Sequence, residues 1–209
     1  MQLNNKALIV SFTFSVMLGT CLIWGYMLPS PLPPPHPEPE ETLVEYVVRV
    51  QETCRAVGSK LRRAVLAEQI ADEAIRTMSG DRRAQEAAVL LVCIESRFDP
   101  QARSSRGAAG LTQIMPKLFL SFANSCGMSG AEAGDIHVTE INLRVGFCLF
   151  RDLLTQYKGN VGLALAAYNS GAGSPTTKKL AAGGEGHVET SGYLAKYLVL
   201  REKLDGVRK

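Results

Sequence analysis

A single carboxylate stands out in the stretch AAVLLVCIESRFDP, residues 87–100, because the residues before it are almost all apolar. Spacing by three and four places an apolar stripe on one face of an α-helix, made of Ala87, Leu91, Ile94 and Phe98. Glu95 borders this stripe. A carboxylate at an apolar rim is desolvated, which raises its pKa and keeps it protonated closer to neutrality. A general acid needs that property, so Glu95 is our candidate catalytic residue.

An ordinary interpretation of Glu95 is also open. Its side chain could reach solvent or pair with Arg97 or Arg103. We expect Asp99-Pro100 to end the helix, because proline cannot continue it and disfavours α geometry in the residue before it. This segment by itself does not choose between a catalytic and a structural carboxylate.

The elements that would position Glu95 are all expected to be helices. Residues 41–78 favour helix with a break at Gly58-Ser59, and Ser79 or Asp81 can cap the helix that carries Glu95. Residues 101–110 are expected to form a loop of small and polar residues. Further helical stretches are expected at 111–127, restarting near Pro116, at 139–157, at 161–171 and at 190–204. The fold class is therefore mainly α, with one helical domain.

The N-terminal residues predict export. Residues 7–28 contain no charge, and 22 residues at about 1.5 Å each give about 33 Å, enough to cross a bilayer core of about 30 Å. Lys6 precedes this run and Glu38 follows it, so the positive-inside rule leaves the N-terminus in the cytoplasm. We prefer an uncleaved anchor, residues 1–28, over a cleaved signal peptide. Residues 29–41 contain seven prolines in thirteen residues and predict a semi-rigid linker.

Charge and cysteine content exclude other classes. A net charge of +3 with no basic block does not indicate a nucleic-acid partner, and no cysteine or histidine spacing indicates a metal. Four cysteines follow the apolar run, and an oxidising compartment would allow two disulfides. Cys126 and Cys148 bracket a helix-loop-helix segment and are one suggested pair, which leaves Cys54 and Cys93. These last two could equally be buried thiols.

Several motifs follow one another in the order of a known family. The segments IESRFDPQA, SSRGAAGLTQIMP, GNVGLALAAYNSGAG and ETSGYLAKYL lie within residues 83–202. Together they resemble the catalytic domain of soluble-type lytic transglycosylases, which are related to goose-type lysozyme and cleave peptidoglycan. The resemblance implies a lysozyme-like helical domain, no cofactor and no metal.

The resemblance also implies roles for individual residues. Glu95 falls on the family's catalytic acid/base, and Ser96 would help to orient it or the substrate. The segment GLTQIMP matches the motif Gly-Leu-x-Gln-x-x-Pro, which lines the sugar groove with Gln113, Ile114 and Met115.

The later motifs complete the implied cleft. AYNSG places Tyr168 and Asn169 in it, and ETSGY places Tyr193 near the catalytic carboxylate. Thr112 stands where the family often has Met and is expected to line the cleft, and Cys93 is unusual so near the acid. Taken singly, Tyr168 could merely fill the core and Gln113 could merely satisfy backbone groups.

The chemistry implied by the resemblance needs one carboxylate. Glu95 would protonate the glycosidic oxygen between N-acetylmuramic acid and N-acetylglucosamine, then take the proton from the muramic C6 hydroxyl as it attacks, leaving a 1,6-anhydro sugar. Hydrolysis by paired carboxylates needs a second Asp or Glu across the sugar. Asp99, Asp135 and Glu140 fit loop or capping roles better, which favours the lytic route.

We therefore expect a single-pass protein of the inner (cytoplasmic) membrane, with its catalytic domain on the periplasmic or cell-wall side. The expected parts are the anchor and linker, a helical N-terminal extension at 42–79, and the catalytic domain at 80–205. Expected partners are peptidoglycan glycan strands and the membrane, through residues 7–28. Partnership with a secretion, conjugation or phage machinery stays open. Alternatives are a hydrolytic muramidase on the same fold and a non-catalytic wall-binding component.

Overall fold

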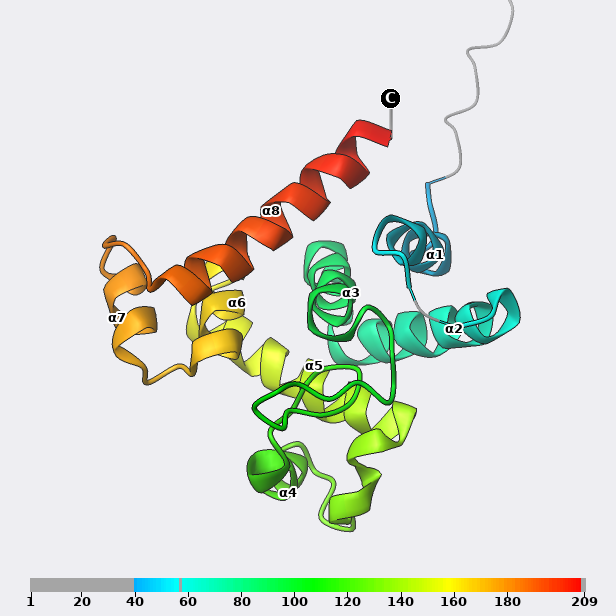
Figure 1. Ribbon diagram of the computed structural model, residues 1–209, viewed down its shortest axis with the longest axis horizontal. Helices are drawn as coiled ribbons and strands as arrows, with labels where there is room; N and C mark the ends of the chain where they lie inside the picture. Colours follow the sequence, from blue (N-terminus) through cyan, green and yellow to red (C-terminus); the bar gives the residue numbers. More distant parts are fainter. Residues whose placement is uncertain (1–39, 57, 208–209) are drawn as a thin grey trace, which may run out of the picture. The chain divides into compact units, whose positions relative to one another are not determined.

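A computed structural model describes residues 40–56 and 58–207, which are mostly helical (Figure 1). The helices are α1 Leu43–Thr53, α2 Lys60–Thr77, α3 Arg82–Ser96, α4 Pro116–Ser125, η1 Ala133–His137, α5 Thr139–Gln156, α6 Val161–Ser170, α7 Pro175–Ala181 and α8 Val188–Val207. Within the described ranges the chain forms isolated β-bridges but no strand. The mainly α fold class is therefore confirmed.

The predicted membrane anchor falls outside this part of the chain. Residues 1–39, which include the apolar run 7–28 and most of the proline-rich linker, are not among the described residues. Within 40–56 and 58–207, none of the helices combines the length and the apolar character that a bilayer crossing requires. The anchor stays a prediction.

Helix α3 occupies the centre of the fold. Figure 1 shows it between α1 and α2 on one side and α8 on the other, with α5 beneath. Eleven of its fifteen residues are buried, so α3 is covered on more than the single apolar stripe that the sequence suggested, and the buried set includes the charged Glu86, which pairs with Arg82 and Arg201. A helix with apolar residues on several sides is stable only when neighbours cover those sides. This position makes α3 a rigid support for the carboxylate at its end.

Helices α1 and α2 share the core with α3. They belong to the predicted N-terminal extension, residues 42–79, and they pack against the helices that follow: α1 contacts α3 and α8, and α2 contacts α3 and α5. The predicted break at Gly58-Ser59 separates them, and Ser59 caps α2. On α2, Leu66 and Ile70 are buried against this core, whereas Leu61 and Val65 are exposed.

A second, smaller core lies below the loop that follows α3. It consists of Ala109, Ile114, Phe119, Ala123, Ile136 and Val145. Helix α4 begins at Pro116, where a missing N–H costs nothing because the first-turn N–H groups have no partner within the helix. The disulfide Cys126–Cys148 ties the end of α4 to α5, and Cys54–Cys93 ties the end of α1 to α3.

The C-terminal helices cover the remaining face of the core. α6 and α8 begin near the expected places, and α6 ends at Gly171 as predicted. The sequence analysis missed α7, although Ser174-Pro175 is a regular start signal: the Ser174 side chain accepts from the Thr177 N–H at 3.1 Å. The short helix α7 leads the chain from α6 into α8.

Candidate active site

Glu95 lies on the last turn of α3, as the sequence predicted. The helix ends earlier than expected, however, because Arg97 and Phe98 adopt positive φ angles of 50° and 63°. Phe98 is buried beneath this turn, which anchors it. Asp99-Pro100 is thus not the stop signal. Asp99 instead stabilises the next turn by accepting from the Gln101 N–H at 3.0 Å.

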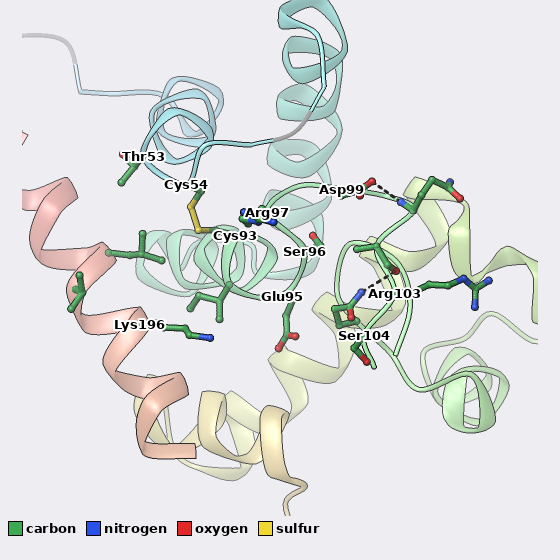
Figure 2. Close-up of a pocket in the computed structure, with 16 residues that line it drawn as sticks. Thr53, Cys54, Cys93, Glu95, Ser96, Arg97, Asp99, Arg103, Ser104 and Lys196 are labelled. Carbon is green, nitrogen blue, oxygen red and sulfur yellow. Dashed lines mark hydrogen bonds between the residues drawn. A yellow bond between two sulfur atoms is a disulfide. The ribbon is translucent and has the colours of Figure 1, made fainter. Parts of the chain in front are cut away.

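The environment of Glu95 favours its neutral form. Partial burial removes water from the carboxylate and raises its pKa to about 7, while the Tyr193 hydrogen bond and the Lys196 charge lower it less strongly. The Tyr193 hydroxyl donates to Glu95 Oε1 at 2.7 Å. Figure 2 shows Lys196 directed from α8 towards the carboxylate. A group that titrates near neutrality can donate and later accept a proton.

The ion pairs that would make Glu95 a structural residue are not formed. Among the described residues, Glu95 has no salt bridge, and Figure 2 shows Arg97 and Glu95 pointing in different directions from the end of α3. Glu95 therefore does not form the structural ion pair with Arg97 or Arg103 that the sequence allowed.

Tyr193 and Tyr168 form the buried wall beside the carboxylate. Burial and the neighbouring Glu95 raise the pKa of both tyrosines well above its ordinary value, so both stay hydrogen-bond donors. The Tyr168 hydroxyl donates to the Thr112 carbonyl at 2.8 Å, and its ring packs edge-on against Phe150 with centroids 6.3 Å apart. Tyr168 thus fills the core and lines the groove at once.

Gln113 holds the loop that faces Glu95. Its φ is 51°, and its side-chain amide donates to the carbonyls of Ala102 at 3.1 Å and Gly110 at 2.9 Å. The backbone-satisfying role that the sequence allowed is therefore the one observed. Gln113 also lines both cavities described below, so the same residue shapes the groove.

Thr112 was predicted to line the cleft, and this was wrong. Its side chain is fully buried and donates to the Asn142 side chain at 2.8 Å, while its N–H donates to the same oxygen at 2.9 Å. The Asn142 amide donates to the Ile136 carbonyl at 2.8 Å. A Cβ at Gly146 would overlap Thr112, so α5 needs glycine there. Asn142 was missed in the sequence analysis. Its signal is that it is a single amide side chain on an otherwise apolar face of the helix, where a buried amide needs hydrogen-bond partners.

The remaining predicted residues lie around the same groove. The buried Ser96 hydroxyl donates to the Val92 carbonyl at 3.1 Å, within its own helix. Asn169 accepts from the Thr190 hydroxyl at 3.4 Å, which joins α6 to α8. Ile114 is almost wholly buried in the smaller core, and Met115 precedes α4; both contribute to the second cavity.

Two cavities share Gln113 in their linings, and we refer to the two together as the groove. The first, about 770 Å³, contains Glu95 and is bounded by the ends of α1 and α3, the following loop and α8. The second, about 480 Å³, is lined mainly by apolar side chains, with Tyr168 and Asn169 at one wall. Both volumes suit ligands of several rings. Within the described part of the chain, no three His, Cys, Asp or Glu residues cluster as metal ligands would.

Only one other carboxylate borders the first cavity in the described residues. That residue is Asp99, and Figure 2 shows its carboxylate and that of Glu95 on different sides of the loop. The described lining of the second cavity contains no Asp or Glu. Within the part of the chain that the structure describes, Glu95 is therefore the carboxylate placed to act on a ligand in the groove.

Comparison with known proteins shows which family the chain matches. The family model described as the transglycosylase SLT domain matches residues 74–189. The chain is 30% identical over 103 residues to the soluble lytic murein transglycosylase of Escherichia coli strain K12, and equally to that of strain O157:H7. These alignments cover 49% of this chain and 16% of each relative, so the chain spans a small part of their length.

Proposed function

The chain belongs to the transglycosylase SLT domain family, and from this membership and the site around Glu95 we propose that it is a peptidoglycan lytic transglycosylase. The substrate would be the β-1,4 bond between N-acetylmuramic acid and N-acetylglucosamine in a glycan strand. The product would carry a 1,6-anhydromuramic end. The observation that carries the proposal is the desolvated carboxylate of Glu95 in the groove, with a pKa of about 7 and a tyrosine hydroxyl 2.7 Å away.

The arrangement suits a proton donor that must later become a base. Because Oε1 accepts from Tyr193, the proton to be donated resides on Oε2. Glu95 gives this proton to the glycosidic oxygen as the bond to the muramic anomeric carbon breaks. The muramic C6 oxygen then bonds to that carbon and returns its proton to Glu95. The reaction consumes no water. The hydrogen bond from Tyr193 stabilises Glu95 while it is ionised, between the two proton transfers.

A hydrolytic muramidase is the second candidate on the same fold. An inverting or retaining hydrolase places a second carboxylate across the sugar. Asp99 is the only other acidic side chain bordering the first cavity within the described residues, and its Oδ1 already accepts from the Gln101 N–H. This observation favours the lytic route over hydrolysis.

Our proposal for location follows the sequence. Residues 7–28 anchor the protein in the inner membrane, and the proline-rich segment holds the domain on the periplasmic or cell-wall side. An enzyme that acts on an extracytoplasmic polymer is useful only there. A secretion, conjugation or phage machinery that opens the wall locally is a compatible partner. Fractionation of membranes, together with protease accessibility of the domain in spheroplasts, tests the location.

The activity is tested by mass spectrometry of muropeptides released from purified peptidoglycan. The unmodified protein should release 1,6-anhydromuropeptides, and the Glu95→Gln variant should lose this release by at least a hundredfold, because it retains shape but has no proton to donate. Reducing-end products one water heavier would identify a hydrolase. Equal release by the variant would refute the role of Glu95, and no release by the unmodified protein would favour a wall-binding component.

A further inference from the structure

The cavity that contains Glu95 extends beyond the part of the chain that matches the family. Its far wall consists of Thr53 and Cys54, at the end of α1, and of Lys196, Val199 and Leu200, on α8. The family match begins at residue 74 and ends at 189. The disulfide between Cys54 and Cys93 fixes the end of α1 to α3. Cys93 lies two residues before Glu95 in the sequence. This side of the groove is therefore built by flanking helices and held rigidly against the reacting carboxylate.

The far wall combines one cation with apolar surface. Lys196 is exposed and directed towards Glu95, and no ion pair or hydrogen bond from its ammonium group is found among the described residues (Figure 2). Val199 follows one turn later on α8 and is 48% exposed, while Leu200 is half-buried beside it. A ligand that fits here carries an anionic group together with small apolar groups.

The second cavity has a different character. Its lining is mostly apolar and aromatic, and Lys117 is the one cationic residue among the described residues that border it. The first cavity has Arg97 and Arg103 at its edges in addition to Lys196. The two halves of the groove therefore offer a cationic and an apolar environment to two different parts of one ligand.

Peptidoglycan supplies a ligand of this kind beside the reacting bond. Its muramic ring carries a short peptide on the lactyl group, and that peptide combines alanine methyl groups with free carboxylates. Because the peptide starts on the ring whose anomeric carbon reacts, its first residues must lie near Glu95. On the premise of the proposed function, we propose that the wall formed by Thr53, Cys54, Lys196 and Val199 is a binding site for this stem peptide. Lys196 pairs with a peptide carboxylate there, and the apolar surface receives the methyl groups.

The test compares two substrates with the full-length protein. One is intact peptidoglycan, and the other is the same material after an amidase has removed the stem peptides. For each variant the ratio of kcat/KM on the two substrates is measured at one pH. This ratio cancels any effect of Lys196 on the pKa of Glu95, because that effect acts equally on both substrates.

Lys196→Met keeps the aliphatic stem and removes the charge, so it should lower the ratio by about fivefold, the upper end for one exposed ion pair. Lys196→Arg should retain the ratio within about twofold. The matched control is Lys203→Met, since Lys203 is exposed on the same helix but is not part of the cavity wall. Thr53→Trp fills the α1 side and should also lower the ratio.

The possible outcomes are distinct. A fall in the ratio for Lys196→Met and Thr53→Trp, with normal thermal unfolding, supports the peptide site. Equal losses on both substrates, or no loss on either, overturn the peptide site while the proposed function stands. Cleavage of neither substrate by the unmodified protein overturns the proposed function, and the peptide site with it.

Discussion

The hydrogen bond from Tyr193 to Glu95 should set the pH range in which the site works. The bond is 2.7 Å long and ends on Oε1, and it offsets part of the effect of burial, so that the pKa of Glu95 is raised to about 7. Tyr193→Phe removes the hydroxyl and keeps the ring. The ionised carboxylate then loses its donor, so the pKa of Glu95 should rise further.

The size of this shift follows from the energy of the bond. A hydrogen bond to a charged group contributes roughly 1.5–3 kcal/mol, and one pKa unit corresponds to about 1.36 kcal/mol. Water that enters beside the partly exposed carboxylate replaces some of the lost interaction. We therefore expect the pKa of Glu95 to rise by about one unit in Tyr193→Phe.

The assay is kcat/KM against pH, because this parameter reports ionisations of the free enzyme. For the unmodified protein the rate should fall as pH rises through about 7, where Glu95 loses the proton that it must donate. For Tyr193→Phe the falling limb should move up by about one unit. Its low-pH plateau should drop by at most about tenfold, because a weaker acid donates its proton more slowly.

Tyr197→Phe is the matched control. Tyr197 lies one turn further along α8, and its ring borders a different cavity, beside Arg83. This variant should leave the falling limb in place. A limb that does not move in Tyr193→Phe, that moves to lower pH, or that moves equally in Tyr197→Phe would refute the assignment of Glu95 as the titrating acid.

Three further predictions concern stability, each measured by unfolding of the full-length protein. The pKa of Glu95 is raised on folding from 4.5 to about 7, so the carboxyl group favours the folded state at low pH, and this contribution is lost as pH rises through 7. Glu95→Gln should therefore be about as stable as the unmodified protein at pH 4.5 and more stable by roughly 3 kcal/mol at pH 8. Gly146→Ala should lower the free energy of unfolding by roughly 1–3 kcal/mol, because the added Cβ would overlap the buried side chain of Thr112. Gly192→Ala is the control and should not destabilise the protein, because a Cβ added there has no heavy atom within 4 Å. Replacing Cys54 and Cys93 together by Ala opens a link of sequence separation 39 and should cost about 3 kcal/mol, whereas an unchanged midpoint would show that packing alone holds α1 in place.

The helices and their breaks could be predicted from local patterns. Gly58 and Gly171 allow the positive φ angles found at these breaks, Ser59 caps α2, and Pro116 fixes φ at the start of α4. None of these local effects depends on distant residues. The early end of α3 could not be predicted in this way. Two consecutive residues with positive φ are tolerated there because Phe98 is buried beneath the turn, which is a tertiary contact.

The candidate acid was found because its signal is also local: a carboxylate at the end of an apolar helix is desolvated wherever that helix packs. Its partners required the fold, because Tyr193 is 98 residues away along the chain and reaches Glu95 only when α3 and α8 lie side by side. The same reason explains the misplacement of Thr112 and the omission of Asn142, which meet across 30 residues. The sequence by itself thus determined the helical class, the candidate acid and the family motifs. Only the tertiary structure decided which side chains face the groove, because burial and hydrogen bonding between distant segments depend on how the helices pack.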